Sequence, residues 1–164
     1  MKLRFLTPQN YKSYGSVISA HGPSVSANMG TAKRFNHLTK VANLRPKRAK
    51  LNVCLFRCRP HRKFPITIKL LERHPFSTQV FIPMTGAKRY LVVVSLGKEK
   101  PDLNSLSAFI ATGSQGISYK PGVWHHPLIA LDKPTDFGCL IWENGTKEDC
   151  QVVKLKNPIL IRIP

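Results

Sequence analysis

Residues 66–84 read ITIKLLERHPFSTQVFIPM, and this stretch decides the fold. Its alternation is typical of a β-strand, in which neighbouring side chains point to opposite faces. One face then carries an apolar run followed by two polar side chains, namely Ile66, Ile68, Leu70, Glu72 and His74. A buried charge needs a partner or a metal ion. The stretch therefore predicts the mouth of a β-barrel, with a polar site at the end of an apolar lining.

Strand patterns continue along the rest of the chain. Thirteen prolines and ten glycines separate short apolar runs, a spacing typical of sandwiches and barrels. The other predicted strands cover residues 51–58, 78–84, 89–96, 106–112, 123–131, 137–143 and 150–156, and the opening strand runs over 64–74. One short helix is expected after Thr7 as N-cap, with Pro8 in its first turn. Asn144–Gly145 predicts a hairpin between the last two strands.

The overall charge is unusual for a chain that otherwise has an ordinary globular composition. It has 164 residues, which suits one domain, and a formal net charge of +18. No apolar run approaches the roughly 18 residues of a membrane span. The segment from Lys33 to Lys69 contains no acidic residue. Such a field attracts polyanions, including nucleic acid, but aromatic residues are not interleaved as in a stacking platform. A solvated basic surface is the favoured interpretation.

The four cysteines suggest no disulfide framework. Cys54, Cys58, Cys139 and Cys150 form no C-x-x-C pair. Cys54 and Cys58, followed by His61, fit a zinc site weakly, and the favoured interpretation is buried, reduced thiols. The basic N-terminus lacks the apolar core and cleavage site of a secretory signal. A cytoplasmic protein is expected.

Two spacings point to a metal or catalytic centre. Glu72-x-His74-x4-Gln79 resembles the first metal-binding motif of the cupin barrels, with Glu in place of the first His and Gln in place of the last Glu. GISYKPGVWH (116–125) resembles the second motif and puts His125 at the ligand position. A metal-free ion pair of Glu72 and His74 that binds substrate directly is the alternative.

The adjacent histidines in PGVWHHPLIAL (121–131) are predicted to play different parts. On a strand they face opposite ways. His125 should face the pocket with Glu72 and His74, whereas His126 should pack beside Trp124 and Leu128. Arg73, opposite in parity to Glu72, is expected in a structural or interface salt bridge.

Nearly the whole chain resembles the ureidoglycolate lyase family. The resemblance is carried by LLERHPFSTQVFIPM, KPDLNSLSAFIATGSQGISYKPGVWHHPLIAL, TDFGCLIWENG and ANMGTAKRF (27–35). It implies one domain over 1–164 with a mainly β, cupin-like barrel (double-stranded β-helix or jelly-roll type) and one or two short helices. It implies a homodimer that cleaves (S)-ureidoglycolate to glyoxylate and urea in allantoin catabolism. Met29 and Trp142–Asn144 depart from the family pattern, as does the strongly basic 45–63 stretch.

Site residues follow from this resemblance and the chemistry of each side chain. We expect catalysis by His125, His74 and Glu72. We expect a divalent metal to be bound by Glu72, His74, Gln79 and His125. The mixed N/O ligands suit Ni, Mn, Fe or Zn without distinguishing them, and no organic cofactor is expected. Substrate binding is expected of Arg34, Asn28, Gly30 and Gln79. Arg34 suits a carboxylate because its guanidinium binds one bidentately, but it is equally compatible with a plain surface charge.

Two other function classes remain open from the residues. The first is a non-catalytic binding protein on the same barrel that touches nucleic acid through its basic surface, although nucleic-acid and membrane partners are not expected. The second is an enzyme for a different small molecule, because a fold does not fix a function.

Overall fold

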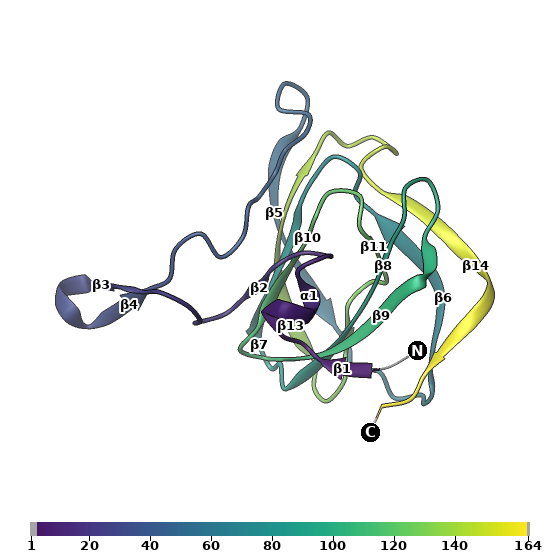
Figure 1. Ribbon diagram of the computed structural model, residues 1–164, viewed down its shortest axis with the longest axis horizontal. Helices are drawn as coiled ribbons and strands as arrows, with labels where there is room; N and C mark the ends of the chain where they lie inside the picture. Colours follow the sequence, from purple (N-terminus) through teal and green to yellow (C-terminus); the bar gives the residue numbers. More distant parts are fainter. Residues whose placement is uncertain (1–2, 164) are drawn as a thin grey trace.

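A computed structural model describes residues 3–163, so the remaining residues of the expected 1–164 domain lie outside the described chain. Two large sheets curl against each other, and a small hairpin stands apart (Figure 1). The seven-stranded sheet has the order β1 (Leu3–Phe5), β9 (Asp102–Thr112), β8 (Arg89–Leu96), β11 (Trp124–His125), β6 (Ile66–Arg73) and β14 (Gln151–Ile161), with β12 (Ile129–Ala130) also paired to β8. The five-stranded sheet has the order β2 (Val17–Ile18), β10 (Gly116–Tyr119), β7 (Gln79–Thr85), β13 (Thr135–Glu143) and β5 (Lys50–Cys58).

Helical structure is confined to two short turns among the described residues. α1 (Pro8–Tyr11) begins at Thr7, whose hydroxyl accepts from the Asn10 N–H at 3.2 Å while the Asn10 side chain accepts from the Thr7 N–H at 3.0 Å. This capping box satisfies two N–H groups at the helix start and confirms the predicted cap. The second turn is η1 (Asn28–Gly30), a 3₁₀ turn. No helix in residues 3–163 has the length and apolarity needed to cross a membrane.

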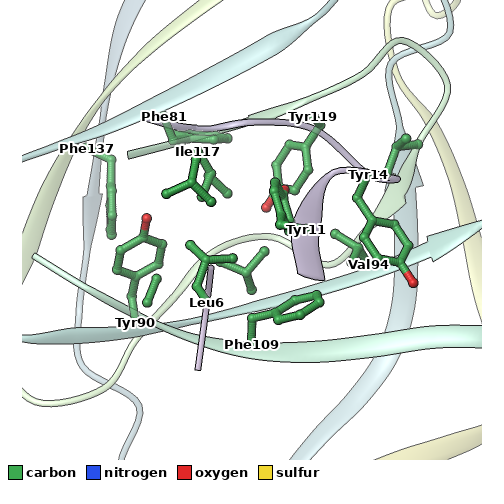
Figure 2. Close-up of a cluster of buried hydrophobic side chains, with 14 of the residues drawn as sticks. Leu6, Tyr11, Tyr14, Phe81, Tyr90, Val94, Phe109, Ile117, Tyr119 and Phe137 are labelled. Atoms are coloured by element: carbon green, nitrogen blue, oxygen red, sulfur yellow. The ribbon is translucent and has the colours of Figure 1, made fainter. Parts of the chain in front are cut away.

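The main core fills the space between the two sheets. Figure 2 shows aromatic and aliphatic side chains from α1 and from both sheets converging there, among them Tyr11, Phe81, Tyr90, Phe109 and Phe137. A second cluster lies on the other face of the larger sheet and includes Leu91, Val93 and Trp124. β8 is therefore buried on both faces, which explains its nearly continuous apolar sequence.

The predicted strand alternation fails in the middle of β6. Ile66 and Ile68 pack in the same cluster as Leu71, not beneath Glu72. Opposite this point, the pairing of β14 with β6 shifts between Lys154 and Ile159. Such an irregularity bends a strand and turns its side chains to the other face. The apolar lining expected from Ile66 and Ile68 is thus wrong, and other elements supply it.

Two connections also differ from expectation. The segment 123–131 is not one strand, because pairing stops at Pro127, which has no N–H to donate. Asn144–Gly145 forms a turn, but not a hairpin, since β13 and β14 belong to different sheets. The Asp149 carboxylate accepts hydrogen bonds from the backbone N–H groups of Asn144, Gly145 and Thr146 at the connection. It therefore holds the turn where the chain crosses from one sheet to the other.

Candidate active site

The two cupin-like motifs meet at one point of the barrel. β11 lies between β8 and β6, and His125 stands directly opposite Glu72 in the ladder. His74 follows the end of β6. Gln79 begins β7 in the facing sheet. The site thus spans the interior between the two sheets, with three candidate ligands on one sheet and Gln79 on the other.

Three of these side chains converge closely. His125 Nε2 lies 3.6 Å from Glu72 Oε1. One ligand atom each from Glu72, His74 and His125 lie within 4.8 Å of one another. The two imidazole rings have centroids 5.5 Å apart. Among residues 3–163 this is the only cluster of three His, Cys, Asp or Glu side chains with such spacing, so the zinc alternative at Cys54, Cys58 and His61 finds no support.

Backbone carbonyls fix both imidazoles in the same tautomer. His74 Nδ1 donates to the Asp149 carbonyl at 2.8 Å, and His125 Nδ1 donates to the Val123 carbonyl at 2.9 Å. A carbonyl oxygen only accepts, so both Nδ1 atoms carry protons. The Nε2 atoms of both rings are buried and have no hydrogen-bond partner in the chain. Nε2 is therefore the ring nitrogen that each imidazole can offer to the site.

A small cavity of about 90 Å³ opens at this cluster. Its lining is mostly apolar, with Phe56, Cys58, Phe81, Pro127 and Leu128. Three polar side chains from the predicted site complete it, namely Glu72, Gln79 and His125. Gln79 Oε1 is buried without a hydrogen-bond partner. Apolar walls with a few convergent polar groups are the usual form of a small-molecule site.

Burial and mutual charge set the protonation of the site. Burial raises the pKa of Glu72, but the nearby His125 imidazole, with further charge from His74 and His126, outweighs it and lowers the pKa below its ordinary value. Burial and the charge of His125 lower the pKa of His74. Glu72 is therefore a carboxylate, and His74 a neutral imidazole, at neutral pH.

Two further side chains touch the cluster and were not predicted. Tyr119 stacks on His125 with ring centroids 3.9 Å apart and 9° between the planes. The Cys150 thiol lies 3.9 Å from Glu72 Oε2, and burial followed by the charge of Glu72 raises the pKa of Cys150 to about 11. Tyr119 lies within the second cupin-like motif, so its parity with His125 was a usable signal. Cys150 reaches Glu72 only through the long-range pairing of β14 with β6.

The neighbouring polar residues take other positions. His126 does not line the cavity, and its Nδ1 donates to the Pro127 carbonyl at 2.7 Å. Leu128, expected beside His126, lines the cavity instead because the strand is interrupted at Pro127. Arg73 is buried, pairs with Glu99 at 3.3 Å and lies over the Trp124 ring. Its salt bridge is structural.

The remaining predicted substrate-binding residues lie elsewhere. Asn28 and Gly30 belong to η1, and Arg34 ends β4 (Ala32–Arg34), which pairs with β3 (Val25–Ala27). All three residues are exposed. Figure 1 shows this hairpin projecting from the barrel. Within one chain, the structure does not bring them together with Glu72, His74 and His125.

The donor set fits a divalent cation. Glu72, Gln79 and His125 line the small cavity, and a ligand atom of His74 lies within 4.8 Å of those of Glu72 and His125. Gln79 Oε1 and the Nε2 atoms of both imidazoles have no hydrogen-bond partner. Such mixed nitrogen and oxygen donors suit a first-row transition metal. The carbonyl partners of both Nδ1 atoms are the outer contacts that typically orient metal-binding histidines.

Comparisons with known proteins agree with this geometry. The family model described as ureidoglycolate lyase matches residues 1–162. The ureidoglycolate lyases of Escherichia coli O1:K1 / APEC and of Shigella boydii serotype 18 are each 41% identical over 155 residues, covering 93% of both chains. The crystal structure of a dTDP sugar isomerase from Desulfovibrio desulfuricans G20 has the same fold, with a TM-score of 0.50 and 14% identity over 84% of this chain and 83% of that chain. The cupin-like barrel is thereby confirmed, and the chain belongs to the ureidoglycolate lyase family.

Proposed function

We propose that this protein is a ureidoglycolate lyase that cleaves (S)-ureidoglycolate to glyoxylate and urea, in the breakdown of allantoin. The observation that carries the proposal is the buried cluster of Glu72, His74 and His125 at the cavity of a chain from this family. The substrate is a small carbinolamine with one carboxylate, a size and polarity that suit a small cavity with few polar groups.

The reaction needs a base and a route for one proton. A basic side chain removes the proton of the substrate hydroxyl, the carbonyl of glyoxylate forms, and the carbon–nitrogen bond breaks with its electron pair going to the urea nitrogen. That nitrogen then takes up a proton, which balances the reaction. Glu72 is a carboxylate with a lowered pKa, and His125 Nε2 lies 3.6 Å from it. These two groups are positioned to accept and return the proton between them.

His74 is the third member of the cluster and is held in a fixed orientation. Its neutral ring is fixed by the Asp149 carbonyl, its Nε2 is buried without a partner, and one of its ring nitrogens lies within 4.8 Å of ligand atoms of Glu72 and His125. Gln79 offers an amide oxygen from the facing sheet. In the metal-free alternative, this oxygen binds the substrate, whose urea N–H groups are matching donors.

We also propose a divalent metal held by Glu72, His74, His125 and Gln79, with no organic cofactor. When bound, such an ion acts as a Lewis acid on substrate oxygens. Ni, Mn, Fe and Zn all suit the donors. Metal content of protein purified without chelators, measured beside activity, tests this point: less than one equivalent in fully active protein would contradict it.

The wider assignments are a single domain over 1–164, a homodimer and a cytoplasmic location. Four free thiols agree with a reducing compartment. Nucleic acid is not proposed as a partner, because several basic residues have structural roles. Arg45 pairs with Glu148 and Asp149 and lies over Phe76, and Arg57 pairs with Asp136.

The direct experiment follows glyoxylate and urea released from (S)-ureidoglycolate, with and without added divalent metals. Equal release of both products is expected. A protein that leaves this substrate intact but turns over a related compound would support a different enzyme on the same barrel. Inactivity on a full panel, together with steeply salt-dependent binding of nucleic acid, would support the binding-protein alternative.

A further inference from the structure

The hairpin of β3, η1 and β4 has little support from its own barrel. Among residues 3–163, β3 and β4 pair only with each other. Figure 1 shows the hairpin held away from the barrel on two extended connections. A lone two-stranded hairpin is only marginally stable in water. A surface outside this protomer would therefore stabilise it.

The tip of the hairpin has an unusual backbone conformation and an exposed apolar side chain. Asn28, Met29 and Gly30 have φ values of 51°, 54° and 92°, all in the left-handed region. Residues other than glycine rarely adopt this conformation, and it persists where surrounding contacts impose it. The turn leaves the Met29 side chain fully exposed, and Val25 at the start of β3 is also exposed. The hairpin thus presents apolar side chains that nothing in its own chain covers.

A matching apolar face lies on the five-stranded sheet. β5 is an edge strand, paired only with β13 among the described residues. Its outward face carries Leu51, Val53 and Leu55, and Val53 is 70% exposed. Ile82 and Met84 of β7 continue this face across Gly138, which pairs with both Leu55 and Ile82. A contiguous apolar face beside a free strand edge marks an interaction surface.

The same strand also borders the active site. Phe56 and Cys58, on the inward face of β5, line the cavity. A segment that lies along the free edge of β5 therefore reaches the rim of the cavity. Figure 1 shows the hairpin leaving the barrel on the side where β5 lies. Two copies related by a twofold axis can then each place a hairpin on the other's β5.

The distribution of charge indicates what the hairpin can supply to the active site of a second copy. No acidic residue precedes Glu72 in the sequence, and the hairpin carries Lys33 and Arg34. The cavity lining has a carboxylate but no lysine or arginine, although the proposed substrate is itself a carboxylate. The site of one chain therefore lacks the cation that its substrate requires, while the hairpin has an exposed arginine without a role in its own chain.

We propose that two copies of this chain exchange hairpins, and that Arg34 of the partner subunit binds the substrate carboxylate at the rim of each cavity. The hairpin packs its apolar tip on the outward face of the partner's β5. The role of Arg34 rests on the proposed function. The exchange itself does not, so the two can be tested separately.

Active-site complementation tests the role of Arg34. At substrate concentrations well below KM, His125→Ala is expected to be nearly inactive, and Arg34→Ala should keep roughly 1–10% of wild-type activity. When both chains are co-expressed, random pairing puts half of the dimers in mixed form, each with one intact site, so about one quarter of wild-type activity should return. A mixture no more active than the two variants apart, beside an active wild type, would overturn the shared site. An inactive wild type would instead refute the proposed function, and the exchange would then be tested by the mass measurement described next.

Mass in solution tests the exchange without any substrate. Val53→Glu and Met29→Glu change side chains that are exposed in the protomer, so the fold should persist, as circular dichroism will verify. The matched control is Leu160→Glu on β14, also exposed at 60% but in the other sheet. Light scattering should give a dimer for wild type and Leu160→Glu, and at least tenfold weaker dimerisation for the other two variants. A monomeric wild type, or dimers unaffected by both changes, would overturn the exchange.

Discussion

The buried cluster and the projecting hairpin both carry residues expected to act on the same substrate, but different forces hold them. Glu72 and His125 sit opposite each other in a strand ladder, and His74 and His125 are each fixed by a backbone carbonyl. The hairpin pairs only with itself among the described residues. Under the proposed exchange, the side chains for the reaction chemistry lie within one chain, whereas substrate recognition depends on assembly.

The largest expected effect comes from the buried side of this comparison. Glu72→Gln keeps the shape of the side chain but removes its charge, and with it the pairing to His125 Nε2 at 3.6 Å. We expect kcat to fall by roughly 10²–10⁴-fold, the usual contribution of a positioned base. Glu99→Gln, which changes an exposed carboxylate in the salt bridge to Arg73, is the control and should keep its activity. Equal losses in the two variants would contradict the role of Glu72.

A smaller effect is expected at the hairpin. Arg34→Ala removes a charged hydrogen-bonding group, worth about 1.5–3 kcal/mol, so kcat/KM should fall by roughly 10–100-fold. The loss should appear mainly in KM, because the group binds a part of the substrate that does not react. Lys33→Ala, an exposed neighbour on the same strand, is the matched control. If the two alanine variants have the same KM, Arg34 is only a surface charge.

The pH profile separates the buried cluster from an ordinary exposed histidine. Burial and the charge of His125 lower the pKa of His74, so its Nε2 stays unprotonated at pH values where a free imidazole is charged. The acid limb of kcat/KM should therefore lie below pH 6.5. Stability follows the same sign: it is fully present above the unfolded histidine pKa and is lost as pH falls below it, because the unfolded chain takes up the proton first. An acid limb above pH 6.5 would show that a different group controls the reaction.

The smallest effect concerns a residue far from either region. Thr7→Ala removes the hydroxyl that caps α1 and should lower the free energy of unfolding by about 1 kcal/mol. Activity per folded molecule should not change. Urea denaturation measures the free energy, and a loss of activity without a loss of stability would indicate that the N-terminal helix contributes to the site.

The sequence predicted the buried cluster well because its signals are local. Glu72 and His74 lie on one stretch, and the turn at Pro121–Gly122 sets the position of His125. The two motifs needed only one assumption, that the barrel brings them together. The helix cap at Thr7 was predictable for the same reason, since capping depends on residues within one turn.

Other features depend on pairing between distant strands and could not be read locally. The break in the alternation of β6 coincides with a shift in its pairing with β14. Cys150 reaches Glu72 through that same pairing. Asn144–Gly145 has the sequence of a hairpin, but the chain changes sheets there. The proposed placement of Arg34 depends on a partner surface, which no spacing within one chain encodes.

The most direct test of the account uses the adjacent histidines His125 and His126. Glyoxylate release from (S)-ureidoglycolate is measured for wild type, His125→Ala and His126→Ala, each with its folding checked by circular dichroism. We predict that His125→Ala loses roughly 10²–10⁴-fold in kcat, while His126→Ala retains turnover per folded molecule and loses stability instead. An active His125→Ala beside an inactive, folded His126→Ala would contradict the account.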